Sequence, residues 1–162
     1  MLVRHGAILA AAFSCLATQA IAQQQPNRFD VTHCYAGTTS AFAQGQAYNI
    51  FSLDIRGTLH AAQQGAPLDH HVVRCFATGG TVGSSPTRVS GFCEVSSSPE
   101  DRILLQWAVE AGRGSASFLA GIGRYKGISG QFSFQPIGGP FPSPEPGVLR
   151  GCSQWTGEYR LP

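Results

Sequence analysis

Apolar and polar side chains alternate along most of the chain beyond residue 27. In the segment 47–60, Phe51, Leu53 and Ile55 occupy alternate positions, and Asp54 and Arg56 lie among them. Side chains two residues apart share one face of a β-strand, so the pattern is typical of strands with one buried face. The three-and-four spacing of an amphipathic helix is missing from this part of the sequence. The alternation predicts eight strands, at 28–37, 47–60, 70–78, 87–96, 101–110, 114–120, 127–136 and 151–161.

Segments rich in glycine, proline and serine separate these predicted strands, as expected for turns and loops. Short strands with this spacing predict an all-β protein, an eight-stranded antiparallel closed barrel that forms a single domain at 23–162. A barrel of eight strands is just wide enough to be filled by its own side chains or to hold one small ligand. The connection 137–150 is rich in proline, and an ordinary surface loop is favoured there over a polyproline ligand.

The stretch FLAGIGRYKGISGQFSF, residues 118–134, contains a G-x-G-x-x-x-G pattern that is one residue longer than the dinucleotide-binding fingerprint. That fingerprint requires a helix after the glycines, because the helix N-terminus binds the phosphate. An alternating segment with Phe132 and Phe134 on one face follows instead. The pattern therefore favours a hairpin turn, in which glycines supply positive φ, over a nucleotide site.

The first 22 residues have the composition of a secretory signal peptide. Arg4 precedes an apolar run from Ala7 to Ala17, which is too short to span a bilayer, and the small-residue sequence AIA precedes Gln23. We expect cleavage after Ala22, in preference to lipid attachment at Cys15, and a periplasmic or secreted location. No second apolar segment reaches membrane length, so we expect no membrane partner after cleavage.

The charge balance gives no reason to expect a nucleic-acid partner. The 162 residues include 11 Lys and Arg against 9 Asp and Glu, and Arg4 leaves with the predicted signal, so the net charge is near +1. A domain that binds nucleic acid or an anionic surface usually carries a strong basic excess.

Four cysteines remain in the mature chain, an even number that predicts two disulfides in an oxidising compartment. Whether a residue falls on an odd or an even position of its strand, here called strand parity, decides its face. Strand parity places Cys75 and Cys93 on inward faces of neighbouring strands, and Cys34 and Cys152 on outward faces of the first and last strands. Disulfide partners must share a face, and closing a barrel sets the first strand beside the last. We therefore predict Cys75–Cys93 and Cys34–Cys152. A metal site is disfavoured because the cysteines are scattered and contain no C-x-x-C, and no cofactor is expected.

The glycine-rich hairpin 118–134 and the final GCSQWTGEYRLP resemble the allene oxide cyclase and dirigent-like β-barrel superfamily. HHVVRCFATGG and GFCEV are similar to segments of small exported bacterial members of that type, so the resemblance covers about residues 70–161. It implies an eight-stranded, calycin-like antiparallel barrel. In plants such barrels include a fatty-acid-derived epoxide cyclase and proteins that orient phenoxy radical coupling. The shared motifs are structural glycines and aromatics, so they bear on fold more than on function.

Strand parity also selects candidate ligand-binding residues. Two histidines and four aromatic residues fall on inward faces and are expected to line a mostly apolar pocket: His33, Tyr35, His71, Trp107, Trp155 and Tyr159. The simpler interpretation is that the histidines are hydrogen-bonded core residues and the aromatics plain core. Adjacent strand residues point in opposite directions, so His70 and His71 are not expected to share a metal.

The carboxylates weigh against catalysis. Parity places Asp54, Glu94, Glu110 and Glu158 on the outer face, which leaves no obvious buried general acid or base unless a β-bulge reverses one of them. Arg124 and Lys126 are expected to be solubilising charges at the turn.

Three hypotheses of function remain. The first is an exported, disulfide-stabilised barrel that binds a small apolar ligand. The second is a protein-interaction or inhibitor module that presents the 137–150 loop. The third is an isomerase of the allene oxide cyclase type, which needs an interior carboxylate that parity does not supply, so the balance is against an enzyme. The sequence marks no interface, and the oligomeric state stays open.

Overall fold

The structure is a computed structural model, and it describes residues 25–45, 47–83, 85–138 and 145–162. These residues form nine β-strands and a single 3₁₀ turn, η1 (Gly123–Tyr125). Within them, no helix is long and apolar enough to cross a membrane. The predicted signal peptide at 1–22, with its cleavage site and Cys15, lies outside the described residues. The strands are β1 (Asn27–Gln44), β2 (Tyr48–Ala61), β3 (Val72–Val82), β4 (Ser85–Pro86), β5 (Val89–Ser96), β6 (Arg102–Glu110), β7 (Arg113–Ile122), β8 (Ser129–Ile137) and β9 (Val148–Arg160).

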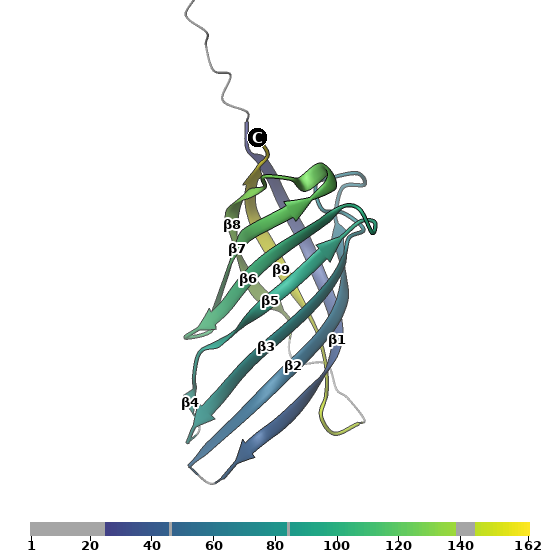
Figure 1. Cartoon of the computed structure of the whole chain (residues 1–162). Coiled ribbons are helices and arrows are strands. Elements are labelled where there is room, and N and C mark those ends of the chain that lie inside the picture. The colour runs from purple at the N-terminus through teal and green to yellow at the C-terminus, as the bar shows by residue number, and fades with distance from the viewer. Residues whose placement is uncertain (1–24, 46, 84, 139–144) are drawn as a thin grey trace, which may run out of the picture.

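Eight of these strands close into an antiparallel barrel, and the predicted fold class is confirmed. The strands are ordered β2-β1-β9-β8-β7-β6-β5-β3, and pairing of β2 with β3 completes the ring. The two-residue β4 only extends the edge of β3 (Figure 1). All eight predicted strands are present. β1 runs well beyond the predicted end at residue 37, because its pairing with β2 continues as far as Gln44.

One end of the barrel, here called the closed end, is filled by side chains. It carries the β2–β3 connection at 62–71, η1 and the C-terminus (Figure 1). The inward faces are those that the alternation predicts, and the buried aliphatic residues near this end include Val31, Leu59, Val73 and Ile103. Leu68, in the 62–71 connection, is also buried and packs on this core. Aromatic rings fill the rest: Phe29, Phe118, Phe132, Tyr125 and Tyr159 lie in mutual contact.

The glycine-rich stretch at 118–134 is a turn between β7 and β8, as the missing helix signal predicts. Gly123 and Gly127 have φ of 62° and 79°, which side chains with a Cβ rarely adopt. A Cβ at Gly123 would also meet the Asp101 carboxylate, which accepts a hydrogen bond from the Arg124 backbone N–H at 2.8 Å. The glycines therefore shape a 3₁₀ turn and not a phosphate-binding loop.

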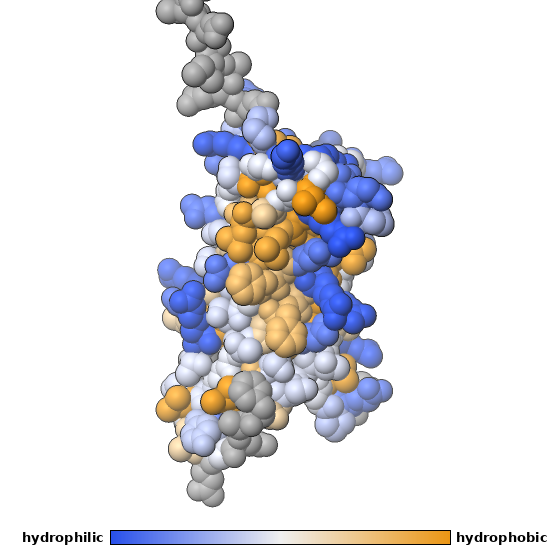
Figure 2. All heavy atoms as spheres, in the orientation of Figure 1, coloured by the Kyte–Doolittle hydropathy of each residue, from blue (hydrophilic) through white to orange (hydrophobic). Residues whose placement is uncertain are grey.

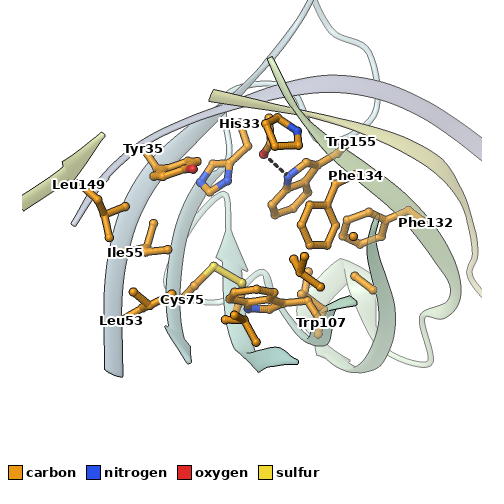
Figure 3. Close-up of a pocket in the computed structure, with 18 of the residues that line it drawn as sticks. His33, Tyr35, Leu53, Ile55, Cys75, Trp107, Phe132, Phe134, Leu149 and Trp155 are labelled. Atoms are coloured by element: carbon orange, nitrogen blue, oxygen red, sulfur yellow. Dashed lines mark hydrogen bonds between the residues drawn. A yellow bond between two sulfur atoms is a disulfide. The ribbon is translucent and has the colours of Figure 1, made fainter. Parts of the chain in front are cut away.

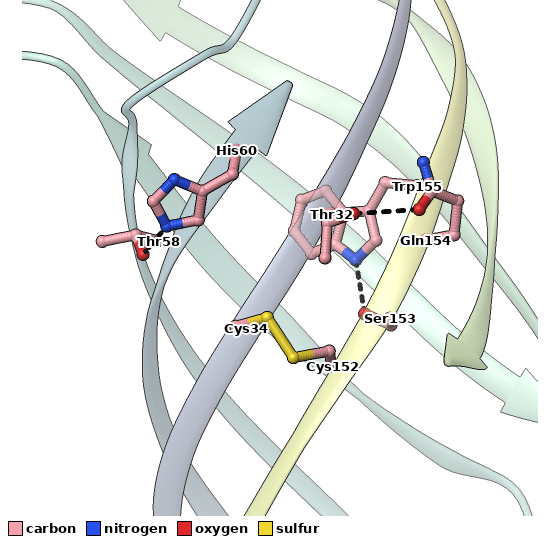
Figure 4. Close-up of a disulfide and its surroundings, with 8 residues drawn as sticks. All are labelled: Thr32, Cys34, Thr58, His60, Cys152, Ser153, Gln154 and Trp155. Atoms are coloured by element: carbon pink, nitrogen blue, oxygen red, sulfur yellow. Dashed lines mark hydrogen bonds between the residues drawn. A yellow bond between two sulfur atoms is a disulfide. The ribbon is translucent and has the colours of Figure 1, made fainter. Parts of the chain in front are cut away.

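Both predicted disulfides are present. Cys75–Cys93 lies inside the barrel between β3 and β5, and Cys34–Cys152 joins β1 to β9 on the outer face (Figure 4). Next to the outer disulfide, the Thr32 hydroxyl donates to Gln154 Oε1 at 3.0 Å. Two disulfides indicate an oxidising, extracytoplasmic environment.

The outer disulfide should contribute strongly to stability, because it closes a long loop. Cys34 and Cys152 are 118 residues apart, so the bond removes much of the freedom of the unfolded chain. Replacing both by alanine is expected to lower the free energy of unfolding by up to about 5 kcal/mol, in the chain-entropy treatment of loop closure. Urea denaturation of the oxidised proteins measures the difference. A loss below about 1 kcal/mol would show that the β1–β9 backbone ladder alone holds the barrel closed.

Candidate functional site

A cavity of about 320 Å³ occupies the other half of the barrel, toward the open end (Figure 3). Its position follows from the lining residues Val109, Gly112, Gly114, Pro136 and Leu149, which all lie where strands begin or end near the β6–β7 and β8–β9 connections. Aromatic and aliphatic side chains form its walls. They include Leu53, Ile55, Leu105, Trp107, Phe132, Phe134 and Trp155.

Few polar groups reach this cavity. They are the imidazole of His33, the hydroxyls of Tyr35 and Ser153, and the indole N–H groups of Trp107 and Trp155. The Ser153 hydroxyl accepts a hydrogen bond from Trp155 Nε1 at 2.9 Å. The His33 ring packs between Tyr35 and Trp155, with centroid distances of 5.2 and 4.8 Å. The lining contains no aspartate, glutamate, lysine or arginine. The inner disulfide Cys75–Cys93 forms part of the wall (Figure 3).

Two ring nitrogens of the lining residues are buried without a hydrogen-bond partner among the described residues, namely His33 Nε2 and Trp107 Nε1. His33 lies on β1 and Trp107 on β6, which are four strands apart in either direction around the ring. The two side chains therefore stand on opposite walls of the cavity, as Figure 3 shows. A buried polar group without a partner costs about 1–3 kcal/mol, so a partner supplied from outside the chain would be stabilising.

Burial keeps the cavity uncharged at neutral pH. Desolvation lowers the pKa of His33 to about 4, because the low-dielectric surroundings disfavour the imidazolium. The same cause raises the pKa of Tyr35 above its ordinary value of 10.0. Both rings are therefore neutral across the physiological range, and the cavity presents dipoles but no net charge.

Two glycines that sequence analysis did not select make room for these polar side chains. A Cβ at Gly57 would lie 2.7 Å from His33 Nε2, and a Cβ at Gly151 would lie 2.7 Å from the Tyr35 hydroxyl. Both glycines lie directly opposite Tyr35 in the sheet, Gly57 on β2 and Gly151 on β9. A glycine within an alternating strand is the sequence signal for such a close approach, and both positions carried it.

The six predicted ligand-binding residues do not form one pocket. His33, Tyr35, Trp107 and Trp155 line the cavity, whereas His71 and Tyr159 lie at the closed end with Tyr125 and Arg124. The expectation of a shared pocket is corrected for these two residues. Strand parity sets the face on which a side chain lies, but its height along the barrel depends on strand tilt and register, which alternation does not encode.

At the closed end, His71 and Tyr125 form a buried hydrogen-bonded pair. His71 Nδ1 lies 2.9 Å from the Asp69 backbone carbonyl, which can only accept, so Nδ1 carries the hydrogen. In the neutral ring, Nε2 therefore accepts from the Tyr125 hydroxyl, at 2.6 Å. Burial raises the pKa of Tyr125 and lowers that of His71, and the Arg124 guanidinium lowers the pKa of His71 further. The pair ties the β7–β8 turn to the β2–β3 connection.

Arg124 is part of this network and not simply a solubilising charge, which corrects the expectation from sequence. Its guanidinium donates to Ser97 Oγ at 2.7 Å, lies 3.6 Å from Asp101 Oδ2 and lies over the Tyr125 ring, 4.9 Å from the centroid. Sequence analysis also missed Tyr125, because parity arguments do not extend into a turn. Lys126 is exposed, as expected.

The remaining polar candidates lie outside the barrel. Asp54, Glu94, Glu110 and Glu158 are on the outer face, as parity predicts, and each lies within 4.0 Å of an arginine. His70 points away from His71 into solvent, near Asp69. Among the residues that the structure describes, no group of three or more His, Cys, Asp and Glu side chains is arranged to hold a metal ion.

Comparison of the chain with protein-family models, with curated proteins and with solved structures finds no match. The resemblance to allene oxide cyclase and dirigent-like barrels stays a prediction from sequence.

His33 should make stability depend on pH. Its pKa is about 4 in the folded protein against an ordinary 6.5, so the unfolded chain binds more protons between these values. The contribution of His33 is complete above pH 6.5 and is lost as the pH falls to about 4. Relative to His33→Gln, the wild type is expected to lose about 3 kcal/mol of unfolding free energy between pH 7 and 4. Urea titrations at both pH values test this; parallel losses in the two proteins would contradict it.

The His71–Tyr125 hydrogen bond should be measurable as a coupling. Tyr125→Phe leaves His71 Nε2 without its main donor, and His71→Leu leaves the phenol without its acceptor, so each change is expected to cost about 1–3 kcal/mol. In a double-mutant cycle based on chemical denaturation, the coupling energy should be about 1–2 kcal/mol. Additive single losses would show that the two side chains stabilise the closed end independently.

Proposed function

We propose that this exported, disulfide-bonded barrel binds a small, uncharged and mostly apolar ligand in the cavity at its open end. The observation that carries the proposal is the lining: aromatic and aliphatic walls, a few polar groups, and no ionised side chain. Small-molecule sites in proteins typically combine an apolar concave wall with a few polar groups that fix orientation.

The volume limits the size of the ligand. About 320 Å³ is at the lower end of the range of about 300–1,000 Å³ for small-molecule sites. It is roughly twice the size of an apolar cavity of about 150 Å³ that holds benzene. A compact molecule with two fused rings fits this space, whereas a long acyl chain would have to project through the open end.

The polar groups favour a ligand that carries a hydrogen-bond acceptor. Trp107 Nε1 can only donate, and it has no partner among the described residues. His33 can donate or accept, according to its tautomer. An anionic or cationic ligand would lose its hydration without gaining a counter-charge, so a neutral carbonyl, ether or similar group is favoured.

The two alternatives have less support. An isomerase of the allene oxide cyclase type would need an acid or base at the cavity; no carboxylate lines it, and His33 with a pKa of about 4 is a weak base. An interaction or inhibitor module would depend on the 137–150 loop, and residues 139–144 lie outside the described part of the chain. Ligand binding is therefore the function that the described residues support best.

The tryptophans provide a direct test, because the chain contains two and both line the cavity. Titration with 2-acetylnaphthalene, a neutral two-ring ketone, is expected to change their fluorescence saturably. The matched anion 2-naphthoate should bind at least about tenfold more weakly, since its charge would be buried without a partner. Val109→Phe at the cavity wall should abolish the response, whereas Val82→Phe, on the exposed outside near the same end, should leave it unchanged.

The proposed hydrogen bond from Trp107 Nε1 to the ligand can be tested with a matched control. Trp107→Phe removes a nitrogen that lacks a partner, whereas Trp155→Phe removes one that already donates to Ser153. The first change should weaken the ketone about tenfold relative to plain naphthalene, and the second should weaken both ligands alike. The proposed function would be contradicted if neither the ketone nor naphthalene bound saturably, or if the ketone and the carboxylate bound with equal affinity.

A further inference from the structure

A band of apolar side chains lies in solvent on the outer wall of the barrel, over β3, β5, β6 and β7 (Figure 2). We call it the outer patch, and it consists of Phe76, Phe92, Leu104, Leu119 and Ile122. Phe76 and Phe92 are directly opposed on adjacent strands and are 59% and 51% exposed. In Figure 2 hydrophilic residues border the band on both sides. The outer patch is therefore a continuous surface with a polar rim.

A β-bulge enlarges this patch. Leu104 pairs with Ala120 and Leu105 with Phe118, so Leu119 is an extra residue in β7 without a partner in β6. Leu119 and Ala120 are both exposed, although neighbours on a regular strand would face opposite sides. The bulge thus turns an additional leucine outward beside Leu104 while Phe118 stays in the core.

The closed barrel does not need these residues. The outer face of an antiparallel barrel in water is normally polar, and apolar residues there usually occur singly. Half-exposed side chains of this size leave roughly 100 Å² each in water, so the outer patch exposes on the order of 500 Å². The largest apolar patch on a typical monomer is about 300–600 Å² and is often functional, so the outer patch is a candidate interaction surface.

We propose that the outer patch is the core of a two-fold symmetric interface with a second copy of this chain. A standard interface buries about 800 Å² on each partner, and homodimer interfaces are about 65% apolar. The apolar area needed is therefore about 500 Å² per chain, which is what the outer patch exposes.

The charges at the rim favour the chain itself as the partner. Arg74 and Glu94 are paired across β3 and β5 in the register row next to the two phenylalanines. Arg102 lies 3.6 Å from Glu94, and Asp54 lies 3.4 Å from Arg74. A rim with both signs interleaved is complementary to its own copy, whereas a nucleic acid, an anionic membrane or a highly charged peptide requires one dominant sign.

This interface is independent of the proposed ligand cavity. The outer patch is on the side wall, whereas the cavity lies within the barrel and is lined by residues at the open end. A side-by-side pair of barrels would leave both open ends free. Failure of ligand binding therefore has no bearing on the dimer, and the reverse also holds.

Sedimentation equilibrium of the purified protein, with its disulfides intact, tests the proposal. The wild type should sediment as a dimer at micromolar concentrations. Phe92→Glu, which places a charge at the centre of the interface, should raise the dissociation constant at least about a hundredfold and give monomers. Tyr48→Glu is the matched control, because Tyr48 is also 51% exposed but lies at the open end outside the outer patch. It should leave the dimer intact.

Hydrogen exchange provides the second measurement, and it also shows whether Phe92→Glu has a folding defect. On dilution of the wild type to monomer, backbone amides of β5 and β6 near the outer patch should exchange faster, while those of β1 and β9 should be unchanged. Phe92→Glu should match the diluted wild type. A monomeric wild type at high concentration, or a dimer that Phe92→Glu leaves intact, would overturn the proposal. So would Phe92-dependent binding to lipid vesicles by a protein that stays monomeric.

Discussion

Pairing of the first long strand with the last is the constraint on which the rest of the structure depends. β1 and β9 pair in register from Asn27 and Tyr159 to Thr38 and Val148, and the Cys34–Cys152 disulfide fixes that register covalently. Without this pairing the sheet would be open, with two unprotected edges and no enclosed interior. Closure with eight strands also sets the width of the interior, which leaves room for side chains or for one small ligand.

The interior divides into two halves that use this room differently. At the closed end, interlocking aromatic rings and Leu68 of the 62–71 connection fill the barrel. Toward the open end, glycines such as Gly112 and Gly114 lie among the aromatic and aliphatic wall residues, and a cavity remains. The closed half therefore supplies most of the close packing that stabilises the fold, and the open half can lack that packing because the barrel is already held together.

The two inward-facing histidines show how context decides what a buried polar group does. His71 and His33 are equally buried, at 4% exposure. His71 has hydrogen-bond partners at both ring nitrogens and joins two connections at the closed end, whereas His33 Nε2 has no partner among the described residues and its ring lies at the cavity wall. The first arrangement stabilises the fold, and the second leaves a buried nitrogen without a partner at the wall of the cavity.

Alternation along the chain, with the turn signals between segments, predicted the eight barrel strands and their inward and outward faces, because the side-chain period of a strand is a local property of the backbone. Together with the even number of cysteines and the closure of the first strand on the last, it also predicted both disulfide pairs. It also placed His33, Tyr35, Trp107 and Trp155 inside. The height of each residue along the barrel depends on tilt and register, so only the tertiary structure separated His71 and Tyr159 from the cavity. Likewise, only the folded chain brought Arg124 and Tyr125 from a turn to His71 and set Phe76 beside Phe92, Leu104 and Leu119 on one surface. These contacts join segments that are distant in sequence, and no local pattern encodes them.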